Sequence, residues 1–280
     1  MTKTSFELIG ADGGPLRGEV RTAGWGVDRP AVIICHGFKG FKDWGFFPHL
    51  AVRLANAGTT VVTFNFSGSG VGPDGDSFSE QERFGHATIS GDLADVRIVT
   101  DALMVGGLVP GLAVPHTLGL LGHSRGGAVA LLFAAHRPEC RALVTWSAIA
   151  SFLRWDEATV ARWRETGRTD IVNARTGDVL PLFSGYLDDL EAHGDRELNL
   201  LGAAASLTIP WLVVHGDADE AVSLEDAHKL ANAAGSDTAT VAVVEGGSHT
   251  LGARHPWLGS TPQLDEGMDL TVEWFARYLL

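Results

Sequence analysis

Cysteine, positive charge and long apolar runs are all scarce in this sequence of 280 residues. Its two cysteines, Cys35 and Cys140, are too few for a disulfide framework, so we expect a reducing compartment. The 21 lysines and arginines stand against 34 aspartates and glutamates, which gives a formal net charge of -13. Because no local basic patch offsets this charge, the sequence predicts that nucleic acid is not a partner.

No apolar stretch has the length that membrane targeting requires. The opening residues, MTKTSFELIGADGG, contain no apolar segment of signal-peptide length. No window elsewhere approaches the roughly 20 apolar residues of a transmembrane helix. We therefore expect a cytoplasmic location and no membrane partner. Nothing in the sequence indicates an oligomeric state.

The composition that remains, 45% hydrophobic and 20% charged, is that of an ordinary globular enzyme. Short β-rich apolar runs alternate with helical patterns, which predicts an α/β fold with a mostly parallel sheet. The expected strands are residues 6–9, 18–22, 31–35, 60–64, 117–121, 142–146, 211–215 and 240–244. The sequence ADGGP between the first two predicts an antiparallel hairpin, and the others are expected to run parallel.

Apolar residues recur with helical spacing in residues 47–57, 90–105, 125–136 and 265–280, and Ser90 is the expected N-cap of the second helix. Residues 147–205 break the alternation, because about 60 residues are too many for an ordinary crossover. We expect a small cap here, inserted after the sixth strand into a core formed by residues 1–146 and 206–280. Within the cap, residues 156–165 are expected to be helical, and two short strands are expected around Arg175 to Asp178.

Several aromatic side chains border or belong to the expected cap. They are Trp146, Phe152, Trp155, Trp163 and Phe183. They either line a pocket for an apolar or aromatic group or only pack the cap against the core, and the second reading is the simpler one.

The sharpest chemical signal is the sequence LGLLGHSRGGAVALLF, in which an apolar strand leads through Gly122-His123-Ser124-Arg125-Gly126 directly into a helix. A G-x-S-x-G segment between a strand and a helix is typical of a nucleophile elbow, where glycines make room for a strained serine. The N-terminal amides of the helix favour negative charge beside that serine. The sequence therefore predicts Ser124 as a nucleophile.

A serine hydroxyl needs a base to accept its proton and an acid to orient the base. The strand at 240–244 is followed by EGGSHTLG, which makes His249 the predicted base, whereas His255 is expected in a surface loop. The strand at 211–215 is followed by GDADEAV, and Asp219 is the predicted acid. Its rival Asp217 is expected to hydrogen-bond the loop backbone as an Asx turn. The alternative of a metal site at His215, Asp217 and Asp219 lacks a further cluster of ligands.

The third strand runs into ICHGFKGF, and an H-G-x turn at this point can supply a second backbone amide to an oxyanion. The predicted oxyanion donors are the backbone N–H groups of Phe38 and Arg125. We expect His36 and His123 to be structural residues at strand ends. Neither is assigned a direct part in catalysis.

This chain resembles the α/β-hydrolase superfamily over nearly its whole length. The resemblance rests on the HGF turn, the GHSRGG elbow, the GDADEAV loop and the GGSH loop. HGFKGFKDWGFFPHLA and FNFSGSGVGPDG resemble bacterial cinnamoyl and feruloyl esterases and the related serine-aminopeptidase-like hydrolases, which carry a comparable insertion. The elbow of these enzymes commonly has Gln or Met where this chain has Arg125, although chlorophyllases also show GHSRGG. Because Arg125 differs from the usual Gln or Met, the resemblance does not identify the substrate.

The resemblance implies a serine esterase that needs no cofactor and takes a small-molecule ester, with an aromatic or short acyl group favoured. The same triad also serves amide, thioester and carbon–carbon bond cleavage on this fold. A serine aminopeptidase would need acidic cap residues for the substrate amine. Asp188, Asp189 and Glu191 are candidates, although a solvated helix face explains them equally well. The remaining alternative is a ligand receptor without catalysis.

Overall fold

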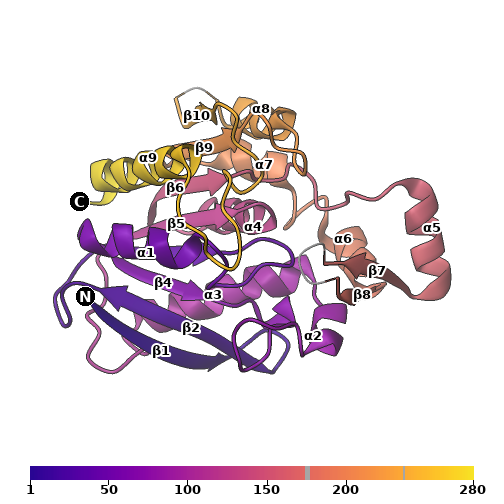
Figure 1. The fold of residues 1–280 in the computed structure, drawn as a ribbon, viewed down its shortest axis with the longest axis horizontal. Helices are drawn as coiled ribbons and strands as arrows, with labels where there is room; N and C mark the ends of the chain where they lie inside the picture. Colours follow the sequence, from indigo (N-terminus) through magenta and orange to yellow (C-terminus); the bar gives the residue numbers. More distant parts are fainter. Residues whose placement is uncertain (174–176, 236) are drawn as a thin grey trace.

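The computed structural model describes residues 1–173, 177–235 and 237–280 (Figure 1). Its centre is an eight-stranded sheet of order β1-β2-β4-β3-β5-β6-β9-β10. The strands are β1 (Thr2–Ile9), β2 (Pro15–Thr22), β3 (Ala31–Cys35), β4 (Thr60–Phe64), β5 (Leu118–His123), β6 (Cys140–Trp146), β9 (Trp211–Gly216) and β10 (Ala239–Val244). The expected hairpin of β1 and β2 is present, β2 is also antiparallel to β4, and all other pairs are parallel. The prediction of a mostly parallel α/β sheet is confirmed.

Helices cover both faces of this sheet. One face packs against α1 (Phe47–Asn56) and α9 (Pro262–Leu279), and the other against α3 (Ile89–Met104), α4 (Arg125–Ala134) and α8 (Leu224–Ala234). Every residue of α4 is buried, as expected for a helix that is apolar around its whole circumference. The sheet and α4 therefore form a rigid support for whatever lies at the carboxyl ends of the strands.

The expected N-cap of α3 is wrong by two residues. The Thr88 side chain accepts a hydrogen bond from the Gly91 N–H and caps the helix, while Ser90 lies inside the first turn. Thr and Ser are both good caps, so composition alone does not separate them. The structure also contains a 3-10 turn, η1 (Ser67–Ser69), and a short helix, α2 (Gln81–Gly85), which the sequence reading does not include.

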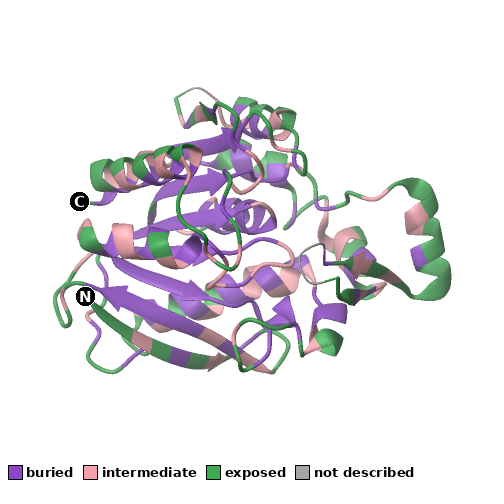
Figure 2. Cartoon of the chain, in the orientation of Figure 1, coloured by how far each residue is buried: buried purple, intermediate pink, exposed green. Residues whose placement is uncertain are grey.

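Between β6 and β9 the chain forms α5 (Glu157–Thr166), the antiparallel pair β7 (Arg168–Val172) and β8 (Val179–Phe183), α6 (Gly185–His193) and α7 (Leu200–Ser206). The expected strand pair is thus present, while Arg175 lies outside the described residues. Figure 1 shows α5, β7 and β8 projecting beyond the sheet, and in Figure 2 most of α5 is exposed. Trp163 is its one buried residue. In contrast, α7 packs on α4 and α8, against the core.

Among the helices that the structure describes, none is both long enough and apolar enough to cross a bilayer.

Candidate active site

Ser124 lies where β5 turns into α4. Its backbone has φ 55° and ψ -122°, a conformation that costs energy for any residue with a side chain. The turn is held because the Ser124 N–H donates a 2.8 Å hydrogen bond to the Trp146 carbonyl at the end of β6. The strained backbone lifts the Ser124 side chain clear of the sheet edge, as an elbow serine requires.

The glycines beside Ser124 are required by close backbone contacts. A Cβ added to Gly126 would lie 2.3 Å from the His36 carbonyl oxygen, and one added to Gly122 would lie 2.2 Å from the Gly126 oxygen. Neither backbone can give way, so only glycine fits at both positions. The same contacts bring the loop after β3 directly against the elbow.

Asp219 and His249 are in direct contact, although 30 residues separate them in the sequence. The Nδ1 atom of His249 lies 2.9 Å from Asp219 Oδ2 and 3.1 Å from Oδ1. Asp219 Oδ1 also accepts hydrogen bonds from the backbone N–H groups of Ala221 and Val222, and the His215 ring approaches Oδ2 to 3.4 Å. The side chain of Asp219 is only 1% exposed, so these donors replace its hydration.

These contacts determine the protonation of the pair. Burial raises the pKa of Asp219, but the nearby His215 ring and the hydrogen bond from His249 outweigh it and hold the pKa well below its usual range. The ionised carboxylate can only accept hydrogen bonds, so Nδ1 of His249 must carry the proton. In the neutral ring, Nε2 is then left with a lone pair that can accept a proton.

Ser124 and His249 line one common pocket of about 310 Å³, whose other walls include Lys39, Trp44, Phe47 and His123. Within the described part of the chain, the Ser124 hydroxyl forms no hydrogen bond to His249. Catalytic hydrogen bonds are often long before substrate binds and shorten in the complex. The structure therefore brings serine, histidine and aspartate to one sheet edge, with the Ser124–His249 hydrogen bond still to be made.

His123 supports the histidine loop. Its Nε2 lies 2.8 Å from the His249 carbonyl oxygen, and the two rings are 4.7 Å apart. Burial lowers the pKa of His123 to about 3, so the ring is neutral at pH 7 and its Nε2–H donates to that carbonyl. This is the structural place expected for His123.

His36 is also structural, and it orients the peptide that was expected to serve the oxyanion. Its Nε2 accepts from the Phe66 N–H, so its Nδ1–H donates to the Gly37 carbonyl at 2.9 Å. Gly40 N–H donates to the same carbonyl at 3.0 Å. In a planar trans peptide the carbonyl and the following N–H point in opposite directions, so fixing the Gly37 oxygen also fixes the Phe38 N–H.

Both expected oxyanion donors are available beside Ser124. Phe38 lines the pocket with Ser124, and Arg125 follows it in the chain. Among the described residues, no acceptor takes a hydrogen bond from the backbone N–H of Phe38 or of Arg125. Unpaired, fixed N–H groups at a helix start and a tight turn are the usual elements of an oxyanion hole.

The Arg125 side chain forms a buried ion pair that the sequence reading missed. Its Nη2 lies 3.1 Å from Asp92 Oδ2, and the two residues are 6% and 2% exposed. The contact lacks hydrogen-bond geometry, because Asp92 Oδ2 has no hydrogen-bond partner in the described structure. Burial raises the pKa of Asp92 to about 7, and the nearby Arg125 opposes this rise only in part. The guanidinium also lies 4.5 Å over the Phe38 ring, which links the two oxyanion segments.

A second pocket, of about 270 Å³, adjoins Ser124 on the cap side. Its walls include Arg125, Ile149, Phe152, Arg154, Trp155 and Tyr186, and it shares Ser124 and Phe38 with the first pocket. We call it the Arg154 pocket and call the first one the His249 pocket.

Of the aromatic residues considered in the sequence, Phe152 and Trp155 line the Arg154 pocket. Trp163 packs behind Trp155 and Tyr186, and Trp146 is buried against Thr271. Phe183 packs on His86 and is in the described lining of neither pocket.

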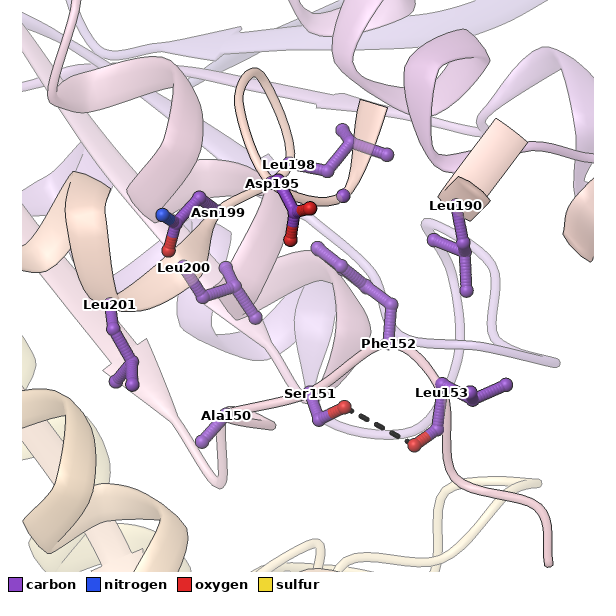
Figure 3. Close-up of a pocket in the computed structure, with 11 residues that line it drawn as sticks. Ala150, Ser151, Phe152, Leu153, Leu190, Asp195, Leu198, Asn199, Leu200 and Leu201 are labelled. Carbon is purple, nitrogen blue, oxygen red and sulfur yellow. Dashed lines mark hydrogen bonds between the residues drawn. The ribbon is translucent and has the colours of Figure 1, made fainter. Parts of the chain in front are cut away.

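A further pocket of about 330 Å³ lies between Phe152, Leu153 and the start of α7 (Figure 3). Phe152 forms the wall that it shares with the Arg154 pocket. None of Ser124, Asp219 and His249 lines it. Because its lining offers no nucleophile paired with a base, we assign it no part in the reaction.

Asp217, the alternative acid, and His255, the other histidine after the last strand, are not part of the contact between Asp219 and His249. Asp217 accepts a 2.7 Å hydrogen bond from the Gly246 N–H, in the loop after β10 and not in its own loop as expected. His255 lies in the surface loop expected for it, between the exposed Arg254 and Pro256, although its own ring is partly buried. Its ring packs against Phe41 and Trp44 with centroids 5.0 and 6.2 Å away, and its side chain is 12% exposed.

The acidic residues considered for amine binding are engaged in structural contacts. Asp188 and Glu191 pair with Arg164 on α5, and Asp189 accepts hydrogen bonds from the N–H groups of Ile89 and Ser90. Neither pocket beside Ser124 has an aspartate or glutamate in its described lining. The described residues also contain no group of three or more His, Cys, Asp or Glu side chains arranged to hold a metal ion.

Two models of known protein families match this chain. Residues 30–166 match the family described as "alpha/beta hydrolase fold", and residues 197–253 match "Serine aminopeptidase, S33". The chain belongs to the α/β-hydrolase superfamily. The resemblance inferred from its motifs is thereby confirmed.

Proteins similar to this chain include one curated relative and several solved structures. A "2,6-dihydropseudooxynicotine hydrolase" from Paenarthrobacter nicotinovorans is 25% identical over 218 residues, which cover 76% of this chain and 50% of the relative. This chain thus spans about half the length of that relative. Est1E from Butyrivibrio proteoclasticus, with ferulic acid bound, aligns with a TM-score of 0.66 at 20% identity, over 96% of this chain and 98% of its own. A structure from Agrobacterium vitis S4 aligns with a TM-score of 0.74 at 18% identity, over 98% of this chain and 99% of its own.

Proposed function

We propose that this hydrolase is a serine esterase that cleaves a carboxylic ester through an acyl-enzyme, with Ser124 as nucleophile, His249 as base and Asp219 as orienting acid. The observation that carries the proposal is the contact of ionised Asp219 with His249 Nδ1. It leaves Nε2 as the accepting nitrogen in a pocket that His249 shares with the strained Ser124. An activated serine needs this combination of tautomer and placement.

In the proposed reaction, Ser124 Oγ attacks the ester carbonyl carbon while its proton passes to His249 Nε2. The N–H groups of Phe38 and Arg125 stabilise the negative charge on the carbonyl oxygen. His249 then protonates the departing alcohol oxygen as the ester C–O bond breaks. Water, deprotonated by His249, attacks the acyl-enzyme and releases the acid, with Ser124 regaining its proton.

A serine aminopeptidase is the second candidate, because residues 197–253 match that family. A free substrate amine would be positively charged and would favour a carboxylate close to the nucleophile. The described linings of both pockets beside Ser124 contain arginine and lysine but no acidic side chain. This charge pattern favours an ester over an aminoacyl substrate.

A substrate panel tests the proposal. We expect the purified hydrolase to turn over 4-nitrophenyl or hydroxycinnamate esters at least tenfold faster than aminoacyl 4-nitroanilides, measured as kcat/KM at pH 7 to 8. Amide bonds are also intrinsically the slower to cleave, so free amino acid esters serve as the matched control. If these outperform their N-acetylated counterparts, or if anilides are the better substrates, the aminopeptidase reading is correct.

A further inference from the structure

The two pockets beside Ser124 can be assigned to the two halves of an ester. The group that His249 protonates is the leaving alcohol, so this half must lie on the His249 side of the nucleophile. His249 lines the His249 pocket and is not part of the described lining of the Arg154 pocket. The alcohol therefore belongs in the His249 pocket, and the acyl chain extends from Ser124 into the Arg154 pocket.

The acyl side combines apolar walls with a guanidinium. Ile149, Phe152 and Trp155 supply apolar surface, and the Tyr186 hydroxyl is already used by the Phe152 carbonyl at 2.9 Å. Such walls suit a flat or extended hydrocarbon acyl group. Arg154 is the exposed polar side chain of this lining.

Arg154 is held in place but retains free donors. Its Nη2 donates a 2.6 Å hydrogen bond to the Ala221 carbonyl in the loop that carries Asp219, which fixes the guanidinium at the pocket. Among the described residues, no carboxylate pairs with Arg154, whereas the neighbouring Arg125 is paired with Asp92. The remaining N–H groups of Arg154 form a rigid fork that matches a carboxylate.

On this basis, and resting on the proposed esterase function, we propose that the substrate is an ester whose acyl chain ends in a second, free carboxylate, which Arg154 binds. An acid half of this kind gains an ion pair that a neutral acyl chain lacks, although the protein as a whole carries a charge of -13. The His249 pocket also contains a cation, Lys39. Its Nζ donates to the Val172 carbonyl, and its compact ammonium lacks the planar fork with which Arg154 matches a carboxylate.

The test compares matched esters within each variant. One pair is methyl 4-carboxycinnamate and methyl 4-methylcinnamate, and the other is mono-4-nitrophenyl glutarate and 4-nitrophenyl hexanoate. We expect the wild type to prefer the carboxylate member of at least one pair in kcat/KM. In Arg154→Leu the ratio of carboxylate to neutral ester should fall about 10- to 100-fold, the range of a charge-assisted hydrogen bond. Arg154→Lys, which keeps the charge but loses the fork, should give an intermediate ratio.

Arg162→Leu is the matched control, because Arg162 is an exposed arginine of α5 that lines neither pocket. Its ratio should equal that of the wild type. No preference in either pair, or equal losses for both members in Arg154→Leu, would overturn the proposal. A preference for esters with the carboxylate on the alcohol would instead assign recognition to Lys39. If Ser124→Ala still hydrolyses the neutral esters, the proposed esterase function itself fails, which is a different result from an unchanged ratio.

Discussion

Ser124→Ala and His249→Ala should each lower kcat for the best ester by about 10⁴-fold or more. The double variant should be hardly worse than either single one, because nucleophile and base act as a unit. Ser124→Ala removes the attacking oxygen, and His249→Ala leaves the hydroxyl without a base. Steady-state rates with an active-site titration would measure both. Additive losses in the double variant would mean that the two side chains act independently.

The acid is tested by a matched pair of aspartates in one loop. Asp219→Asn should cost about 10⁴-fold in kcat, because an amide can donate to Nδ1 and so favour the wrong tautomer of His249. Asp217→Asn should keep nearly the wild-type kcat, because in the described part of the chain the Asp217 carboxylate hydrogen-bonds only to the backbone N–H of Gly246. The reverse order of effects would exchange the two assignments.

Asp92→Asn should raise the free energy of unfolding at pH 8, because burial raises the pKa of Asp92 to about 7 and the folded state therefore favours its neutral form. The asparagine amide has the size of that neutral carboxyl and carries no charge. The gain should be smaller at pH 5, where the carboxyl is already neutral in the folded state. Urea unfolding at both pH values would measure it, and a variant less stable than the wild type at pH 8 would show that the ion pair with Arg125 outweighs the burial of the charge.

The carboxyl group of Asp92 also determines in which direction stability changes with pH. Burial raises the pKa of Asp92 from 3.8 to about 7, so between these values the folded state binds more protons than the unfolded state. This group therefore makes the protein less stable as the pH rises through that window, and Asp92→Asn should remove that part of the slope. Asp219 acts in the opposite sense. Its pKa is lowered on folding, so its contribution is present above the usual carboxyl range and lost as the pH falls below it.

Much of the fold could be predicted because periodicity in the sequence reports burial directly. The predicted strand 211–215 differs from β9 by one residue, and the predicted strand 31–35 coincides with β3. The elbow was also predictable, since a strand, two glycines and a helix leave few conformations for Ser124. Helices α6, α7 and α8 were not predicted. α6 and α7 span only 9 and 7 residues and owe their stability to packing against the core. α8 buries Ala227, Leu230 and Ala231 on one face, and this helical spacing was visible in the sequence.

The candidate site was predictable in its residues but not in its contacts. Sequence order indicated His249, and the resemblance of the GDADEAV loop to the superfamily indicated Asp219; the structure brings the two to 2.9 Å. No local pattern indicated that Asp92 pairs with Arg125, or that Arg154 reaches the Ala221 carbonyl. Residues this far apart in sequence come into contact only through the tertiary fold. The sequence around an arginine does not show whether its side chain is paired or exposed.

Labelling with a fluorophosphonate tests most directly whether Ser124 is an activated nucleophile, because only such a serine reacts quickly with this reagent. We predict one label per chain, located by peptide mass spectrometry at Ser124, with labelling lost in Ser124→Ala and strongly slowed in His249→Ala. Labelling at another residue, or no labelling of a folded wild-type protein that still hydrolyses esters, would contradict the account.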